Sequence, residues 1–164
     1  MTLAEINALD RAGFVGRFGF LFEHSPWIVE AAAARRPFAD LEAMHAALMA
    51  VVAESPRDAQ LALLRAHPEL AKKVAMTAES ISEQASAGLD RLSREEFERF
   101  HTLNDAYFGK FGFPFIICVR LTDKAGILAA MESRLHNSEA SELATALDEV
   151  GKIVGLRLKD AVSE

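Results

Sequence analysis

His67 and Glu83 are the two side chains of this sequence that best suit proton transfer. His67 follows an apolar helical run at residues 61–64 and precedes Pro68, which disfavours the α conformation at the residue before it. A helix should therefore end at His67, where the helix dipole favours an imidazolium and where histidine can exchange protons near neutral pH. Both residues also have ordinary structural interpretations. His-Pro stops helices, and the four residues from Ser80 to Glu83 fit an S-x-x-E capping box.

Arg157 falls on the apolar side of the last predicted helix, which runs from residue 139 to about residue 162. The apolar residues of that helix form one stripe: Leu143, Leu147, Val150, Ile153, Val154 and Leu158. At about 100° per residue Arg157 lies on this stripe, whereas Lys152 and Lys159 lie elsewhere and should be solvated. A guanidinium that points into a core needs a negative partner. We therefore expect either an internal ion pair or a fork held ready for a carboxylate or a planar urea.

These two interpretations of Arg157 predict opposite effects of Arg157→Met. If the cation waits for a ligand, removing its charge should be neutral or stabilising to the free protein. If it belongs to an internal pair, the same change leaves a buried carboxylate alone and should cost roughly 3–5 kcal/mol.

Helix signals recur along the whole chain, and strand signals are nearly absent. Capping residues and apolar stripes predict helices that start at Thr2, Phe14, Ser25, Asp40, Ser55, Ser80, Ser93, Thr122 or Asp123, and Ser138. We find no internal repeat, low-complexity tract or linker. The sequence therefore predicts an all-α fold, with one compact domain of about eight or nine helices over residues 1–164.

Residues 109–119 interrupt the helical pattern. Gly109, Gly112 and Pro114 should break the long helix that starts at Ser93, and the apolar residues 115–119 predict one short extended segment. The backbone N–H and C=O groups of such a segment must find partners. The segment either packs in the core against a neighbouring helix or offers these groups to an amide-rich ligand.

The composition limits the classes of partner. Hydrophobic residues make up 51% of the 164 residues and charged residues 26%, as expected for a folded soluble domain. The net charge of −6 argues against nucleic acid, which needs a basic face. The single cysteine, Cys118, rules out a disulfide within the chain and fits a reducing, cytoplasmic compartment. The N-terminus does not resemble a secretory leader, and the apolar stretches are too short to span a membrane.

Several common catalytic motifs are absent from the sequence. There is no H-E-x-x-H, no cysteine pair and no Asp/Glu/His cluster at metal-ligand spacing, so we expect no metal site. There is also no G-x-S-x-G, no P-loop and no dinucleotide fingerprint.

Five segments in order resemble the OHCU decarboxylases, the 2-oxo-4-hydroxy-4-carboxy-5-ureidoimidazoline decarboxylases of uric acid breakdown. They are Phe-Glu-His-Ser-Pro-Trp at 22–27, His-Pro-Glu-Leu at 67–70, residues 80–89 with their Glu-Gln pair, Phe-Gly-Phe-Pro-Phe-Ile at 111–116, and the stretch from Lys152 to Arg157 with its Leu-Arg-Leu. The segments span nearly the whole chain.

This resemblance implies an all-α, cofactor-free enzyme, commonly a homodimer, that converts the ureidoimidazoline to (S)-allantoin in purine catabolism. Matched residue by residue, the family's catalytic positions fall on His67, Glu83 and Arg157. Its substrate-binding positions fall on Pro68, Ser80, Gln84, Phe115 and Ile116.

The chain departs from the family pattern after His67. The connection between His67 and Glu83 is shorter than usual, and Glu69 stands where the family usually has aspartate. Two alternatives to the decarboxylase therefore remain, a paralogue that acts on another small ureido compound and a helical interaction module without activity. The presence of His67, Glu83 and Arg157 together favours the enzyme, because an interaction module does not need all three.

Overall fold

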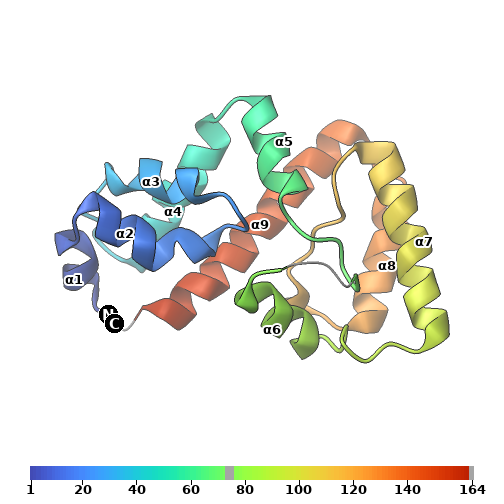
Figure 1. Cartoon of the computed structure of the whole chain (residues 1–164). Helices are drawn as coiled ribbons and strands as arrows, with labels where there is room; N and C mark the ends of the chain where they lie inside the picture. The colour runs from blue at the N-terminus through green and yellow to red at the C-terminus, as the bar shows by residue number, and fades with distance from the viewer. Residues whose placement is uncertain (73–75, 163–164) are drawn as a thin grey trace. The chain divides into compact units, whose positions relative to one another are not determined.

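The computed structural model describes residues 1–72 and 76–162, and those residues form helices and connections without any β-strand (Figure 1). Its α-helices are α1 (Leu3–Ala8), α2 (Arg11–Phe18), α3 (Pro26–Ala33), α4 (Leu41–Glu54), α5 (Arg57–Arg65), α6 (Ala78–Ser86), α7 (Arg94–Phe111), α8 (Lys124–Arg134) and α9 (Glu139–Ala161). Two 3₁₀ turns, η1 (Gly19–Leu21) and η2 (Val119–Leu121), lie between them. The all-α prediction is confirmed. None of the helices in the described ranges is long and apolar enough to cross a membrane.

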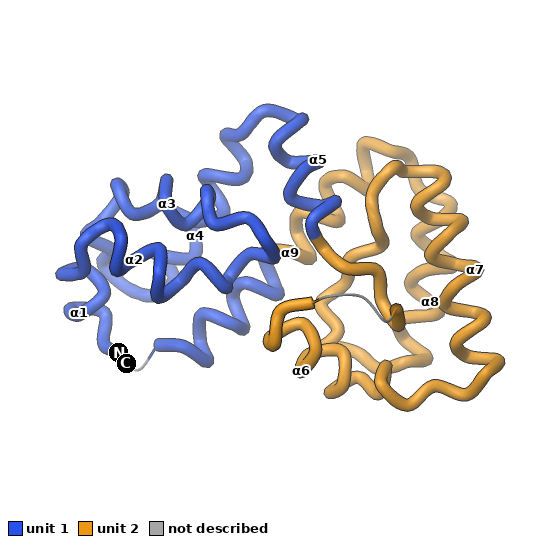
Figure 2. The backbone as a smooth tube through the Cα atoms, in the orientation of Figure 1, with its two compact units in different colours: residues 1–66, 151–164 blue, residues 67–150 orange. Residues whose placement is uncertain are grey.

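The chain divides into two compact units, which Figure 2 shows in two colours. Unit 1 consists of Met1–Ala66 and Gly151–Glu164, and unit 2 consists of His67–Val150. The boundary at residues 150 and 151 falls inside α9, so this one helix supplies residues to both units.

The core of unit 1 is built from α2, α3 and α4. α2 packs against α3, and α3 packs against α4 (Figure 1). Their apolar stripes bury large side chains completely, including Phe14, Phe18, Ile28, Met44 and Leu48. The final part of α9 is tied to α4, because Nε2 of His45 lies 2.8 Å from the carbonyl oxygen of Gly151.

Unit 2 contains α6, α7, α8 and the first part of α9, and it includes a cluster of aromatic rings. α7 packs beside α8 (Figure 1). α6 packs against η2. Tyr107 on α7 meets Phe115 edge to face, with 5.3 Å between the ring centroids. Phe111 and Phe113 complete this cluster, which therefore gathers the end of α7 and the apolar segment that follows it.

Most of the predicted helix starts are correct in position, but the side chains of three serines do not cap as predicted. The hydroxyl of Ser25, before α3, donates to the carbonyl of Glu23 instead. Thr2 and Ser93 form complete capping boxes. The helix predicted to start at Ser80 begins at Ala78, and the hydroxyl of Thr77 accepts the N–H of Ser80. Ser55 does not cap α5, because its hydroxyl donates to the carbonyl of Val51 instead.

Three helix ends also differ from the prediction. α7 continues through Gly109 and stops at Phe111, because Gly112 adopts the left-handed conformation with φ of 77° that ends a helix. The single helix predicted over residues 14–22 instead begins at Arg11, capped by Asp10, and ends at Phe18, where η1 follows. α5 ends at Arg65, two residues before His67.

Candidate active site

His67 lies just beyond α5, at the start of the connection that leads to α6. The side chains of His67 and Pro68 are both half-buried. The prediction placed His67 at the helix end itself, whereas the structure inserts Ala66 as the C-cap. His67 is thus carried by the connection rather than by α5, so the conformation of the connection determines where its backbone lies.

Two buried amide side chains hydrogen-bond to one peptide group of this connection, the one between Leu70 and Ala71. Nδ2 of Asn104 on α7 donates to the Leu70 carbonyl at 2.9 Å. Oε1 of Gln84 on α6 accepts the Ala71 N–H at 3.1 Å. Ala71 itself has φ of 62°, in the left-handed region that non-glycine residues rarely adopt. The two amides thus hold a strained turn three to four residues after His67.

α6 carries three of the predicted site residues within five positions. Ser80 and Gln84 are buried, at 6% and 8% exposure, and Glu83 is half-buried. The contact with Ala71 shows that the Gln84 amide holds the protein's own backbone, which sequence reasoning did not predict. A pocket of about 750 Å³ in unit 2 is bordered by Gln84 and Ile81 but not by His67 or Glu83, so we do not assign the chemistry to it.

The helix α6, which carries Glu83, packs against η2, and η2 follows the apolar segment that contains Phe115 and Ile116. Burial is the main cause that raises the pKa of the Cys118 thiol, and the negative charges of Glu149 and Glu83 raise it further. The packing of α6 against η2 brings the helix that carries Glu83 beside the end of this segment.

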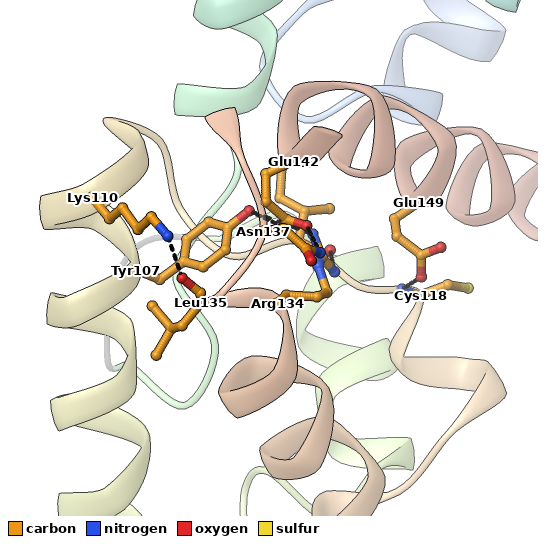
Figure 3. Close-up of polar contacts among 9 residues, drawn as sticks. Tyr107, Lys110, Cys118, Arg134, Leu135, Asn137, Glu142 and Glu149 are labelled. Atoms are coloured by element: carbon orange, nitrogen blue, oxygen red, sulfur yellow. Dashed lines mark hydrogen bonds and ion pairs between the residues drawn. The ribbon is translucent and has the colours of Figure 1, made fainter. Parts of the chain in front are cut away.

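The predicted extended segment is present, and side chains bind its peptide groups. Phe115 and Ile116 are buried, at 1% and 3% exposure. Nη1 of Arg134 donates to the Ile116 carbonyl at 2.7 Å, and the Cys118 N–H donates to Oε1 of Glu149 at 3.1 Å. Figure 3 shows Glu149 beside Cys118 and, separately, Arg134 within a polar cluster. Core packing, the first of the two interpretations of this segment, is thus observed.

Arg157 is buried in unit 1 with only 4% of its surface exposed, as its position on the helical stripe predicted. Nη1 donates to the carbonyls of Phe20 and Leu21 at 3.1 and 3.3 Å. Nη2 lies 3.6 Å from a carboxylate oxygen of Glu23, which is completely buried. The internal ion pair is therefore present, and Arg157 is not an uncompensated cation in this structure.

The Arg157 pair also joins two of the segments that carry the family resemblance. Glu23 belongs to the segment 22–27, and Arg157 ends the stretch that starts at Lys152. His24, next to Glu23, adopts a left-handed conformation with φ of 49°, where the chain turns towards α3. All predicted site residues other than Arg157 belong to unit 2.

Sequence reasoning missed two buried carboxylates on α9, Glu142 and Glu149. They lie seven residues apart and therefore share a helix face. The predicted stripe was partly wrong here, because Leu143 and Leu147 are only half-buried while the two glutamates are buried. The helical spacing that located Arg157 could have located them, had charged residues been tested as members of the buried face.

No group of three or more His, Cys, Asp or Glu side chains that could hold a metal ion occurs within residues 1–72 and 76–162.

Comparison with known proteins relates nearly the whole chain to one family. The sequence profile of the family described as OHCU decarboxylase matches residues 7–159. The 2-oxo-4-hydroxy-4-carboxy-5-ureidoimidazoline decarboxylase of Haloferax volcanii is 46% identical over 99% of this chain and 97% of its own length.

Two solved structures share the fold. A crystal structure of (S)-allantoin synthase superposes with a TM-score of 0.80 at 31% identity, over 99% of this chain and 54% of that one. A crystal structure of OHCU decarboxylase in the presence of (S)-allantoin gives a TM-score of 0.71 at 25% identity, over 85% of this chain and 93% of that one. The profile match and the identity to the Haloferax protein show that the chain belongs to the OHCU decarboxylase family.

Proposed function

We infer that this protein is a carboxy-lyase that converts 2-oxo-4-hydroxy-4-carboxy-5-ureidoimidazoline to (S)-allantoin in urate catabolism. The observation that carries this inference is the 46% identity, over essentially the full length of both chains, to a protein that bears the name of this decarboxylase. The presence of His67, Glu83 and Arg157 at the positions implied by the resemblance supports it. We further propose that residues 1–164 act as one domain.

The reaction needs proton transfer more than it needs an external electron sink. The substrate has a carboxylate and a hydroxyl on one ring carbon, next to a C=N bond. When the bond to the carboxylate breaks and CO₂ leaves, its electron pair moves into the ring towards the C=N. The ureido-bearing carbon then takes up a proton, and the hydroxyl carbon becomes the ring carbonyl of allantoin. Delivery of that proton to one face gives a single enantiomer.

His67 and Glu83 supply the proton chemistry in this proposal. His67 hydrogen-bonds to the hydroxyl or the carboxylate of the substrate and then delivers the proton. Glu83 orients His67 or the hydroxyl. General acid–base assistance of this kind contributes roughly 10²–10⁴ in rate.

The remaining predicted site residues bind the substrate. Arg157 holds a polar edge of the ring or of its substituents, for which a guanidinium fork is suited. The binding positions proposed from the resemblance are Pro68, Ser80, Gln84, Phe115 and Ile116. Gln84 contributes in part by fixing the backbone after His67 through its contact with Ala71.

The test follows freshly oxidised urate by circular dichroism with and without the protein. We expect the (S)-allantoin signal to appear faster than in the uncatalysed reaction and to exceed that of a racemate. Racemic allantoin at the uncatalysed rate would contradict the proposal and favour the interaction module. Turnover of a different ureido compound, with none of this one, would favour the paralogue.

We also propose that the enzyme acts in the cytoplasm as a homodimer. The single cysteine supports the compartment. The family resemblance supports the dimer, as do large apolar side chains that unit 2 leaves exposed on α7, Phe97 at 46% and Phe108 at 43%. Light scattering of the eluting protein should give twice the 17.9 kDa chain mass, and a mass of one chain would contradict the dimer.

A further inference from the structure

Two charged side chains of opposite sign hydrogen-bond to the backbone of the segment 115–118, each at a different peptide group. The Arg134 guanidinium donates to the Ile116 carbonyl, and the Glu149 carboxylate accepts the Cys118 N–H. Each charge matches the polarity of the backbone group that it meets. The segment forms no strand within the described residues, so these contacts take the place of a β-ladder for two of its peptide groups.

Arg134 is itself fixed by a buried network, which Figure 3 shows between α7, α8 and α9. Its Nε donates to Oε1 of Glu142 at 2.8 Å, and the Tyr107 hydroxyl donates to the same oxygen at 2.6 Å. Asn137 donates to Oε2 of Glu142 at 2.9 Å. Burial and the bond to Glu142 raise the pKa of Tyr107, so its hydroxyl stays protonated and remains a donor.

The same guanidinium also contacts a side chain of the segment. Its central carbon lies 4.3 Å from the centroid of the Phe115 ring, within cation–π range. Arg134 therefore fixes Phe115 by its ring and Ile116 by its carbonyl. Only a planar group with several donors can make the carbonyl contact, the Glu142 contact and the ring contact together.

Burying two charges costs free energy that core packing alone does not require. Arg134 is 9% exposed and Glu149 is 8% exposed. Apolar residues of similar volume often replace buried ion pairs without loss of stability. The two charges add strong hydrogen bonds that fix the orientation of particular peptide groups.

We propose that Arg134 and Glu149 are positioning residues that hold the segment 115–118 in the conformation that binds the substrate. The proposal rests on the proposed function, because it takes the backbone at Phe115 and Ile116 as a binding surface. Neither side chain needs to touch the substrate.

The first test compares Glu149→Gln with Glu149→Met, measuring kcat and KM for the ureidoimidazoline. Glutamine keeps an oxygen that can accept the Cys118 N–H, so KM should stay within about threefold of the parent value. Methionine keeps the volume and loses the acceptor. Because a misplaced binding group weakens ground-state and transition-state binding alike, KM should rise about tenfold or more with kcat nearly unchanged.

The second test compares Arg134→Lys with Tyr107→Phe. Lysine keeps the charge beside Glu142 but cannot also hold the Ile116 carbonyl and the Phe115 ring, so KM should rise. Tyr107→Phe removes the hydroxyl that donates to Glu142 and accepts from Nη2 of Arg134, and it keeps the ring beside Phe115 and the two contacts to the segment's backbone. It should lower Tm and leave KM unchanged.

These outcomes separate a positioning role from a structural one. Unchanged KM in Arg134→Lys, or KM that follows Tm across all four variants, would overturn the proposal. If Glu149→Met does not fold, the comparison of Arg134→Lys with Tyr107→Phe decides alone. An inactive parent protein would instead refute the proposed function, and equal melting with and without (S)-allantoin would point to the same failure.

Discussion

Arg157→Met should destabilise the free protein strongly, because the structure gives Arg157 an internal partner. Glu23 has no exposed surface, and Arg157 is 4% exposed. Removing the guanidinium leaves a buried carboxylate without its cation, and such a break costs about 3–5 kcal/mol. For a chain of this length that loss corresponds to a fall in Tm of roughly 6–20 °C.

A double-mutant cycle with Glu23→Met identifies the cause of that loss. The protein with both substitutions has no isolated charge and should regain at least about 2 kcal/mol over Arg157→Met alone. Recovery should be incomplete, because the carbonyls of Phe20 and Leu21 also lose their donor.

The assay is denaturant unfolding of the four proteins of the cycle, followed by far-ultraviolet circular dichroism. If Arg157→Met unfolds within about 0.5 kcal/mol of the parent, the difference normal for an ordinary surface change, the pair does not stabilise the fold. The same result would revive the idea of a cation held ready for a ligand. If the double variant is no more stable than Arg157→Met, the ion pair is not the cause of the loss.

Three further predictions concern single residues. His67→Ala should abolish turnover with little change in Tm, because His67 is half-buried on a connection; a large fall in Tm with activity retained would assign it a structural role. Because the pKa of Cys118 is raised above its ordinary value of 9.0, the folded state keeps the thiol proton longer than the unfolded state, so stability should fall as the pH rises above 9. In Cys118→Ala the free energy of unfolding, measured by denaturant at several alkaline pH values, should fall less steeply with pH. An identical pH dependence in the two proteins would contradict the raised pKa of Cys118. Thr77→Ala should cost about 1 kcal/mol by removing the cap of α6, and Ser82→Ala, which changes an exposed serine of the same helix, serves as the control. Equal losses in the two would contradict Thr77 as the cap.

Capping rules predicted the start of a helix correctly where one residue determines that start. Asp40 caps α4 as predicted, and of the two predicted alternatives, Thr122 and Asp123, it is Asp123 that caps α8. Ser80 does not cap α6, because another hydrogen-bond acceptor, Thr77, lies three residues earlier and caps the helix there. The choice between two nearby caps depends on where the preceding chain arrives, which tertiary contacts determine.

The sequence proposed which residues form the candidate site but did not identify the residues that they contact. Helical spacing placed Arg157 inward, yet nothing in the spacing identified Glu23, 134 positions away, as its counter-charge. Gln84 was expected to meet the substrate, and the structure shows it holding Ala71. Such pairs depend on how distant segments meet, and a single sequence does not contain that information.

The turn at Ala71 also constrains how this sequence can drift over evolutionary time. A left-handed φ of 62° disfavours every residue with a side chain and excludes valine or isoleucine most strongly. Glycine or asparagine would occupy the position without this strain. The side chains of Asn104 and Gln84 help to hold alanine in this conformation, because they hydrogen-bond to the peptide group between residues 70 and 71. We therefore expect positions 71, 84 and 104 to vary together among descendants of this chain.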